Sequence, residues 1–306
     1  MMGGYELRER LGEGGMGEVW RAHDARLGRD VAIKRIAKSV GLHEEYAVRM
    51  KREARALAGM QHPTLVTIYD IQTDASDSPF IVMELLEGET VGSWVERHPG
   101  AGGNVVIPLL LPVLDGLAAA HRAGIVHRDL KPDNLFLVRG VDGTLHPKVI
   151  DFGIASIEEL GSNLTTGPLG TPAYMAPEQI TLGSPIGPYT DIWSMCVCLY
   201  AAAVGQSPFD HGSVAEIFRR VREAPLPFPR NGTLDGPLFS ILARGTRKQP
   251  SERFQTMGEL KEALVLWQQG RTVTGPPRAS TTPPPQPAQA ATDLDRVIQD
   301  AFGKKP

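Results

Sequence analysis

The segment His-Arg-Asp-Leu-Lys-Pro-Asp-Asn at residues 127–134 decides the fold of this chain. It matches the pattern H-R-D-L-K-P-x-N at every specified position and without an insertion. Three shorter motifs follow it in order: Asp151-Phe152-Gly153, Gly170-Thr171-Pro172 and Ala176-Pro177-Glu178. A chance match to the first motif in 306 residues is negligible, and the order of all four makes coincidence harder still.

A glycine-rich segment, Gly12-Glu13-Gly14-Gly15-Met16-Gly17, lies near the start of the chain. Its G-x-G-x-x-G pattern is weak by itself, because the chain contains 33 glycines. A dinucleotide-binding fold needs a helix directly after the third glycine, whereas residues 18–22 favour a strand. The alternative is a strand–turn–strand hairpin, in which glycines let backbone N–H groups approach nucleotide phosphates.

A lysine on the next predicted strand fits this interpretation. Lys34 ends the sequence Val-Ala-Ile-Lys, seventeen residues after Gly17. A lone lysine is usually a solvated charge, but in this setting it predicts a group that holds the α- and β-phosphates. Glu53, on the helix that follows, is the candidate counter-ion; Glu44 and Glu45 compete for that role, although acids at a helix start simply suit the helix dipole.

Periodicity divides the chain into a strand-rich first part and a helix-rich second part. The first 86 residues predict a small antiparallel sheet with one helix, with strands over Tyr5–Leu11, Gly17–Asp24, Asp30–Ile36, Leu65–Ile71 and Phe80–Leu85 and the helix over Glu44–Gly59. After Gly88 the predicted helices are Val91–His98, Ile107–Ala123, Thr190–Val204, Val214–Arg222, Leu238–Thr246 and Met257–Gln269. Asp142-Gly143 predicts a two-residue hairpin turn between strands at Leu135–Val138 and Lys148–Ile150. The fold class is therefore α+β.

Composition and the lengths of the apolar runs argue against several classes of protein. The net charge of −3 argues against a nucleic-acid-binding protein, which usually has a basic excess. The two cysteines, Cys196 and Cys198, are expected to be buried and unpaired, which fits a reducing cytoplasm. No signal peptide is evident, and the apolar runs Val105–Leu114 and Met195–Val204 are about half the ~20 residues that span a bilayer. We therefore expect a soluble, cytoplasmic chain.

The last part of the chain differs in composition from the rest. Residues 270–306 are rich in Pro and Ala and predict a disordered tail. Near its end, Leu294, Val297, Ile298 and Phe302 share one helical face. This predicts a short terminal helix, either a marginal helix of the tail or a docking helix.

From about Tyr5 to Gln269 the motifs resemble the protein kinase family. Within it, Gly-Glu-Gly-Gly-Met-Gly-Glu-Val at 12–19 and Thr-Pro-Ala-Tyr-Met-Ala-Pro-Glu-Gln at 171–179 resemble the bacterial Hanks-type, or eukaryotic-like, serine/threonine kinases. The resemblance implies a bilobal kinase domain over 1–269, with a β-sheet N-lobe at 1–86 and a mainly α-helical C-lobe at 87–269. It also implies ATP as phosphoryl donor, with Mg²⁺ or Mn²⁺ as the metal ion.

The resemblance implies a role for each motif residue. Asp129 would accept the proton of a substrate hydroxyl, and Lys131 would stabilise the γ-phosphate. Asn134 and Asp151 would hold the metal ion, which prefers oxygen ligands. Thr171 would hydrogen-bond to the loop at residues 127–134, called the catalytic loop below, and act in catalysis rather than as a phosphorylation site.

The nucleotide site is implied in the same way. Met83 would be the gatekeeper, the Glu84 carbonyl and the Leu86 amide would bind the adenine edge, and apolar side chains would enclose the ring. The full implied set of nucleotide contacts is Leu11, Gly12, Glu13, Gly14, Gly15, Met16, Gly17, Val19, Ala32, Lys34, Met83, Glu84, Leu86 and Phe136.

Regulation and scaffolding roles follow from the resemblance too. Arg128, beside the catalytic aspartate, would pair with a phosphorylated loop, so Thr165 and Thr166 are candidate autophosphorylation sites. Asp191 would bond to the backbone of the catalytic loop, and Arg253 would pair with Glu178.

Two other functions stay open at this point. A pseudokinase would bind ATP as a signalling module, but such chains typically lose Lys34, Asp129 or Asp151, and all three are present. A small-molecule phosphotransferase would lack the segment that ends in Ala176-Pro177-Glu178. The expected partners are protein substrates with Ser or Thr, and a homodimer through the N-lobe is a further candidate. We expect no nucleic-acid partner and no membrane segment in this chain.

Overall fold

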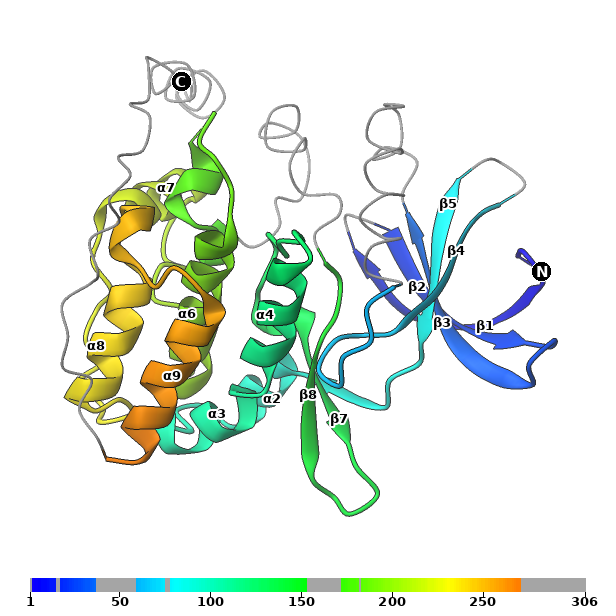
Figure 1. Cartoon of the computed structure of the whole chain (residues 1–306), viewed down its shortest axis with the longest axis horizontal. Helices are drawn as coiled ribbons and strands as arrows, with labels where there is room; N and C mark the ends of the chain where they lie inside the picture. Colours follow the sequence, from blue (N-terminus) through cyan, green and yellow to red (C-terminus); the bar gives the residue numbers. More distant parts are fainter. Residues whose placement is uncertain are drawn as a thin grey trace.

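The computed structural model describes residues 2–14, 17–36, 59–74, 78–152, 172–181 and 183–270. They form a small lobe of strands and a larger, mainly helical lobe (Figure 1). The small lobe is a five-stranded antiparallel sheet in the order β1-β2-β3-β5-β4. Its strands are β1 (Tyr5–Gly14), β2 (Gly17–Asp24), β3 (Arg29–Ile36), β4 (Ile68–Thr73) and β5 (Pro79–Glu84).

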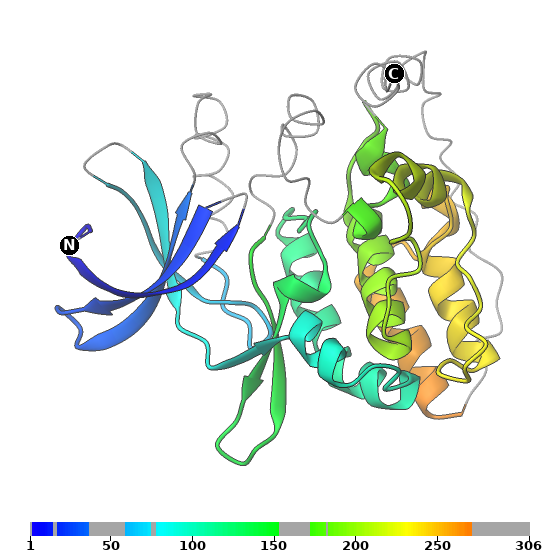
Figure 2. The ribbon, with the colours of Figure 1, turned by 180° about the vertical axis from the view of Figure 1, so that it is seen from behind.

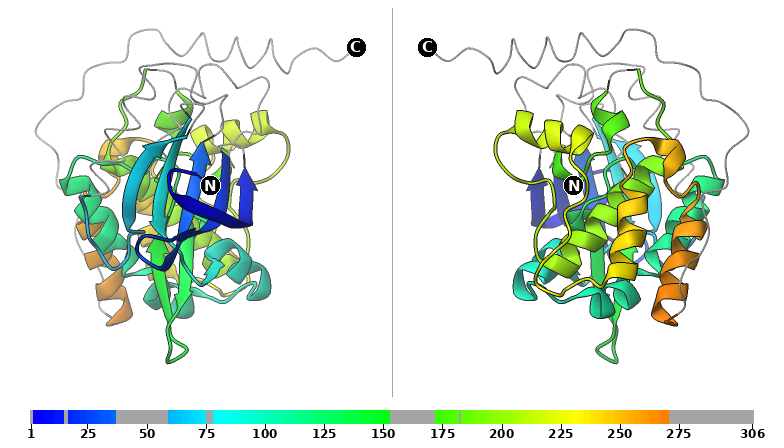
Figure 3. Two further views of the ribbon diagram at one scale, coloured as in Figure 1. Left: turned by 90° about the vertical axis from the view of Figure 1, so that its right-hand side faces the viewer. Right: turned by 90° about the vertical axis from the view of Figure 1, so that its left-hand side faces the viewer.

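The larger lobe holds the helices, which lie behind the small-lobe strands when the molecule is viewed along its long axis (Figure 3). In the described residues they are α2 (Val91–Arg97), α3 (Gly103–Leu110), α4 (Val113–Arg122), α6 (Pro188–Val204), α7 (Val214–Glu223), α8 (Gly236–Gly245) and α9 (Met257–Gln268). The predicted α+β fold with a sheet lobe and a helical lobe is confirmed. The predicted helix at 44–59, apart from Gly59, and the tail from residue 271 lie outside the described residues.

A second sheet lies at the junction of the lobes, and its hairpin projects from the body of the molecule (Figure 2). It has the order β6-β7-β8, with β6 (Gly88–Thr90), β7 (Leu135–Arg139) and β8 (Leu145–Val149). The predicted two-residue turn is wrong, because five residues, 140–144, connect β7 to β8. Asp142 accepts hydrogen bonds from the Thr144 backbone N (3.0 Å) and hydroxyl (2.6 Å), so Asp142-Gly143 forms a turn inside a longer loop.

The small-lobe sheet has two different apolar faces. Val31 and Ile33 point to one face and are fully buried with Tyr5, Ala22 and other apolar side chains. Ala32 alternates to the opposite face, where it packs with Met83. Because side chains alternate along a strand, this register also places Lys34 on the face of Ala32.

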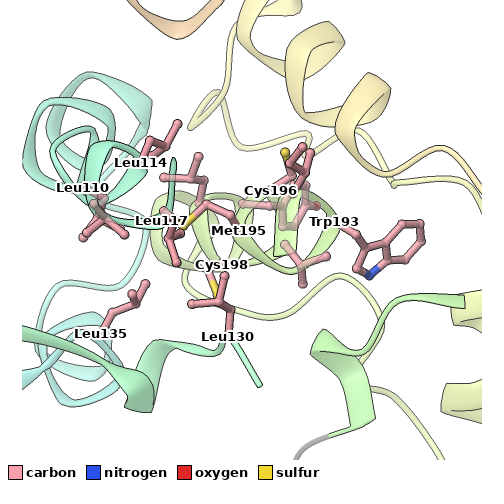
Figure 4. Packing of buried hydrophobic residues seen from close by; sticks show 14 of the residues in the cluster. Leu110, Leu114, Leu117, Leu130, Leu135, Trp193, Met195, Cys196 and Cys198 are labelled. Atoms are coloured by element: carbon pink, nitrogen blue, oxygen red, sulfur yellow. The ribbon is translucent and has the colours of Figure 1, made fainter. Parts of the chain in front are cut away.

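The core of the helical lobe is built around α6. Met195, Cys196 and Cys198 on this helix are fully buried and pack among leucines that include Leu110, Leu114, Leu117, Leu130 and Leu135 (Figure 4). Both cysteines are free thiols, as predicted. Burial raises the pKa of Cys196 to about 12, so its thiol stays protonated and packs as a small apolar group.

The helix predicted over Ile107–Ala123 is in fact two helices, α3 and α4, bent by 43°. The break is at Leu111–Pro112, because proline has no N–H to donate and its ring collides with the preceding turn. Within the described part of the chain no single helix is long and apolar enough to cross a membrane. The α3–α4 pair passes that test only by combined length and composition; Ile107 and Leu114, one from each helix, lie in the buried core.

A buried ion pair connects the short 3-10 helix at Pro177–Ile180, before α6, to the segment before α9. The Arg253 guanidinium donates to both carboxylate oxygens of Glu178, each at 2.7 Å, and both side chains are almost fully buried. Thr190 donates a further hydrogen bond to Glu178 at 2.8 Å. Two parallel charge-assisted bonds satisfy groups that are otherwise expensive to bury.

Removing one partner of this pair should strongly destabilise the protein. Arg253→Met leaves the Glu178 carboxylate buried without its cation, and we expect the free energy of unfolding to fall by about 3–5 kcal/mol. Urea denaturation measures the change. The control is Lys261→Met, which breaks the exposed Lys261–Asp115 pair (2.7 Å) and should cost less than about 1 kcal/mol. Equal losses in the two variants would contradict the assigned role of the buried pair.

Candidate active site

In the loop at 127–134, two side chains donate hydrogen bonds to the carboxylate of a third. Asp129 Oδ2 accepts hydrogen bonds from Lys131 Nζ at 3.1 Å and from Asn134 Nδ2 at 2.9 Å. Asn134 Nδ2 also donates to the Asp129 backbone carbonyl at 2.7 Å. The side chains of Asp129 and Lys131 keep 16% and 17% of their surface exposed. The Asp129 side chain is therefore partly accessible to solvent, and its carboxylate is oriented by two neighbouring donors.

Asp191, near the start of α6, holds the backbone of this loop. Its carboxylate accepts from the backbone N–H groups of His127 and Arg128, both at 2.8 Å, and contacts His121 Nε2 at 2.7 Å. Asp191 is fully buried, so these three donors replace its water of hydration. The contacts of Asp191 agree with its expected bonds to the loop backbone. Its contact with His121 was not predicted from the sequence.

The loop backbone is unusual at Arg128, whose φ is +68°. Non-glycine residues rarely adopt this left-handed conformation, and surrounding contacts must hold it in place. Asp191 binds the Arg128 N–H, and Gln179 Nε2 donates to the Arg128 carbonyl at 2.6 Å. Bonds on both sides of the residue therefore fix the turn that leads into Asp129.

His127 connects the loop to the segment that carries Asp151. The His127 Nε2–H donates to the Ile150 carbonyl at 3.0 Å, while Nδ1 accepts from the Asp129 backbone N–H at 3.2 Å. The ring also packs against Phe152 with centroids 4.6 Å apart. Burial lowers the pKa of His127 below its ordinary value, so the imidazole is neutral and this pattern of one donor and one acceptor is stable.

Lys34 and Asp151 meet across the two lobes. Lys34 Nζ lies 2.9 Å from Asp151 Oδ1, with 15% and 28% of the two side chains exposed. Lys34 comes from β3 of the small lobe, and Asp151 is the second residue after the end of β8. Asp151 also has a left-handed backbone, with φ at +52°. The chain therefore brings a cation and a carboxylate from distant sequence positions to one point beside the catalytic loop.

The donor atoms suit a hard divalent cation. Because both hydrogen bonds of Asn134 to Asp129 use its amide nitrogen, the amide oxygen is the atom of that side chain suited to ligate a metal. The Ile150 backbone N–H donates to the backbone carbonyl of Asn134 at 2.9 Å, which places Asn134 beside the residue that precedes Asp151. No group of three or more His, Cys, Asp or Glu that could hold a metal occurs in the residues described. An amide oxygen and one carboxylate fit Mg²⁺, which usually takes few protein ligands together with phosphate and water.

The glycine-rich segment includes the end of β1 and the start of β2, which pair as antiparallel strands. Gly12 pairs with Val19 and Gly14 with Gly17, so β2 starts at the third glycine of the motif. The hairpin interpretation is confirmed, and the dinucleotide-binding alternative is excluded by the strand. Leu11 and Glu13 are exposed on β1.

An apolar cluster lies under the hairpin. Ala32, Met83 and the neighbouring side chains of Val19 and Leu86 belong to it, as the predicted adenine slot requires. Phe136, which was also predicted to contact adenine, is not a member of this cluster; it lies on β7, where it pairs with Thr90 of β6. The cluster also contains Val66, Leu85 and Ile150, which were not predicted. Val66 and Ile150 are ordinary apolar residues, and no sequence motif marks them.

The remaining predicted site residues cannot be placed. Those outside the described residues are Gly15, Met16, Glu53, Thr165, Thr166 and Thr171.

Comparison with known proteins agrees with this geometry. The family model "Protein kinase domain" matches residues 5–264. The chain belongs to the protein kinase family. Serine/threonine-protein kinase Pkn1 of Myxococcus xanthus is 35% identical over 268 residues, which is 86% of this chain and 38% of Pkn1. Serine/threonine-protein kinase PknB of Mycobacterium tuberculosis is 33% identical over 96% of this chain and 45% of PknB. The predicted bacterial Hanks-type branch of the kinase family is therefore confirmed.

This kinase chain spans less than half the length of Pkn1 and of PknB, but 67% of PknA of Mycobacterium tuberculosis, to which it is 33% identical. Among solved structures, the kinase domain of PknI of Mycobacterium tuberculosis superposes with a TM-score of 0.70 at 23% identity. That superposition covers 87% of this chain and 96% of the PknI chain. At this identity the likeness concerns the fold alone.

The Asp191 anchor leads to a local prediction. Asp191→Asn replaces one acceptor oxygen by an N–H donor that faces the backbone N–H groups of the loop. We expect the free energy of unfolding to fall by about 1–3 kcal/mol and the amides of His127 and Arg128 to exchange with deuterium faster. Asp115→Asn, at an exposed carboxylate, is the control. Unchanged exchange at those two amides would contradict the anchoring role.

Proposed function

We propose that this chain is an ATP-dependent protein serine/threonine kinase that transfers the γ-phosphoryl group to protein hydroxyls. The contact between Lys34 Nζ and Asp151 Oδ1 at 2.9 Å carries the proposal, because it joins the two lobes beside Asp129. Phosphoryl transfer requires mainly positioning and charge neutralisation. A cation, a metal-ligating carboxylate and a proton-accepting carboxylate around one point can supply both.

Asp129 is proposed to orient the attacking hydroxyl and accept its proton. Its carboxylate already accepts bonds from Lys131 and Asn134, which restrict its orientation before substrate arrives. Lys131, 3.1 Å from that carboxylate, would neutralise charge on the transferred phosphoryl group. The proton acceptor and the cation thus approach the reacting atoms from the same loop.

Lys34 and Asp151 are proposed to act on the phosphates. Asp151 and Asn134 would hold Mg²⁺, or Mn²⁺, which when bound neutralises the phosphate oxygens. Lys34 would then bind the α- and β-phosphates, with Glu53 as its counter-ion. The backbone of the Gly12–Gly17 hairpin would cover the phosphates.

The adenine ring is proposed to lie in the apolar cluster under that hairpin. Val19 and Ala32 would enclose it from the small lobe and Phe136 from the larger lobe, with Met83 at the back. The Glu84 carbonyl and the Leu86 N–H would bind its edge. We also infer a kinase domain over 1–269, divided at residue 86, with a separate tail at 270–306.

The named relatives support the choice of hydroxyl acceptor. Pkn1, PknB and PknA are all named serine/threonine-protein kinases. Lys131 in the catalytic loop and the Gly170-Thr171-Pro172 motif resemble the same branch. Thr171 is proposed to bond to the catalytic loop, and proteins that present Ser or Thr are the proposed substrates.

A phosphoryl-transfer assay tests the proposal. With radiolabelled ATP, Mg²⁺ and a generic basic protein, we expect wild type to label the protein on Ser and Thr. Asp129→Asn should lower the rate by about 10²–10⁴-fold by removing the proton acceptor, and Lys34→Met by about 10²–10³-fold by removing a phosphate ligand. The control Lys261→Met should keep the wild-type rate. A wild type that binds nucleotide but transfers nothing would instead indicate a nucleotide-binding signalling module.

Autophosphorylation of the loop after Asp151 gives a second test. Thr165 and Thr166 belong to this segment of the sequence, and the guanidinium of Arg128 would bind a phosphate on one of them through two hydrogen bonds. We expect mass spectrometry after incubation with Mg-ATP to detect phosphate on Thr165 or Thr166 in wild type but not in Asp129→Asn. An active preparation without phosphate on either threonine would refute this proposal.

A further inference from the structure

Lys148 lies on β8 in a position that the catalytic motifs do not explain. In the register of the second sheet it stands directly opposite Phe136 on β7, so the two side chains share one face. The other face carries Leu135, Leu137 and Val149, which are fully buried in the helical lobe. The face of Phe136 and Lys148 is therefore the one turned away from that core.

The ammonium of Lys148 bonds to the small lobe. Its Nζ donates to Glu84 Oε1 at 2.8 Å and is 3.3 Å from the Leu65 carbonyl. Glu84 is the last residue of β5 and the first residue of the peptide, residues 84–86, proposed to bind adenine. A side chain of the larger lobe thus holds the residue at which the chain leaves the small-lobe sheet.

The Glu84 carboxylate has a second donor. The backbone N–H of Thr67 donates to Glu84 Oε1 at 2.7 Å, and the Glu84 N–H donates back to the Thr67 carbonyl at 2.9 Å. One carboxylate oxygen therefore accepts from both lobes at once. Its position is fixed by a backbone group on one side and by the Lys148 ammonium on the other.

The segment that contains Thr67 is itself bound to β8. The Val66 N–H donates to the Val149 carbonyl at 2.9 Å, and the Val149 N–H donates to the Thr64 carbonyl at 2.8 Å. A continuous set of hydrogen bonds therefore connects β8 to residues 64–67, residues 64–67 to Glu84, and Glu84 to Lys148 on β8. Val66 also lines the apolar cluster proposed to hold adenine, so this set of bonds frames that site.

Burial makes this ion pair different from those on the surface. Only 16% of the Lys148 side chain and 20% of the Glu84 side chain are exposed, compared with 33% and 49% for Lys261 and Asp115. Water and salt screen the inner pair less. Loss of one partner also leaves the other charge partly desolvated, which favours a rearrangement of the backbone that carries it.

We propose that Lys148 is a positioning residue for the nucleotide: by binding Glu84 it fixes the peptide at 84–86 over the face of Phe136. The inference rests on the proposed function, because it assigns adenine to this peptide. Lys148 itself contacts no reacting group, and the catalytic loop and Lys34 keep all their contacts without it. Its loss should therefore weaken nucleotide binding and leave the chemical step unchanged.

The experiment measures binding and turnover separately in wild type, Lys148→Met, Lys148→Arg, Glu84→Gln and the double variant Lys148→Met/Glu84→Gln. Isothermal titration with the non-hydrolysable ATP analogue AMP-PNP and Mg²⁺ gives Kd, and the transfer assay gives KM for ATP and kcat. Lys261→Met is the matched control, since it removes a lysine–carboxylate pair of similar length far from the nucleotide site. Thermal unfolding identifies any variant that does not fold.

For Lys148→Met we expect Kd and KM to rise about 3- to 30-fold, which is the range of effects of residues that act without touching the ligand. The value of kcat should stay within about twofold. Lys148→Arg should recover most of the binding because arginine keeps a donor for Glu84. The double variant should bind better than Lys148→Met, because it no longer leaves a carboxylate without its cation.

Three results would overturn the inference. They are an unchanged Kd in a folded Lys148→Met, a loss confined to kcat, and a Kd in Lys261→Met that rises as much as in Lys148→Met. These outcomes differ from failure of the proposed function. Wild type that binds AMP-PNP but transfers no phosphate would refute the kinase proposal while the Kd series still decides the role of Lys148. Wild type that binds no nucleotide would refute both.

Discussion

The buried Asp191 carboxylate is the interaction on which the rest of this site depends. It joins α6, a helix most of whose residues are buried, to the backbone of His127 and Arg128 through two hydrogen bonds of 2.8 Å. An anionic acceptor without exposed surface needs such donors, so the loop cannot move away without leaving a charge unsatisfied. The left-handed turn at Arg128 and the orientation of Asp129 both follow from this constraint.

A second constraint relates the two lobes. Residues 64–67 bond to β8 on one side and to Glu84 on the other, so the small-lobe sheet is attached to the larger lobe at the edge of the proposed adenine site. At the opposite end of the site, Lys34 reaches Asp151. Polar contacts between the lobes thus accompany the apolar cluster of Val66, Met83 and their neighbours. Polar groups at the border can orient a ligand, and the apolar interior can hold its ring.

Several parts of the fold were predictable because the signal was local. The strand alternation in β2 and β3 and the helical periodicity of α7 and α9 gave bounds within one or two residues of those observed. The errors arose where local signals compete. Proline at position 112 divided one predicted helix into α3 and α4, and hydrogen bonds from Thr144 to Asp142 enlarged a predicted two-residue turn. The three-residue strand β6 has too few residues to show alternation and is formed by pairing with β7.

The sequence by itself determined the family and the α+β fold class, and it supplied the residues proposed for the site. Those conclusions depend on residue type and order, and the segment from His127 to Asn134 specifies its chemistry within eight consecutive positions. Only the tertiary structure decided which residues surround them. Val66, Ile150, His121 and Lys148 belong to no motif, and each acquires its role from a partner far away in the chain. The physical reason is that burial and hydrogen bonding act between neighbours in space, which a linear pattern does not encode.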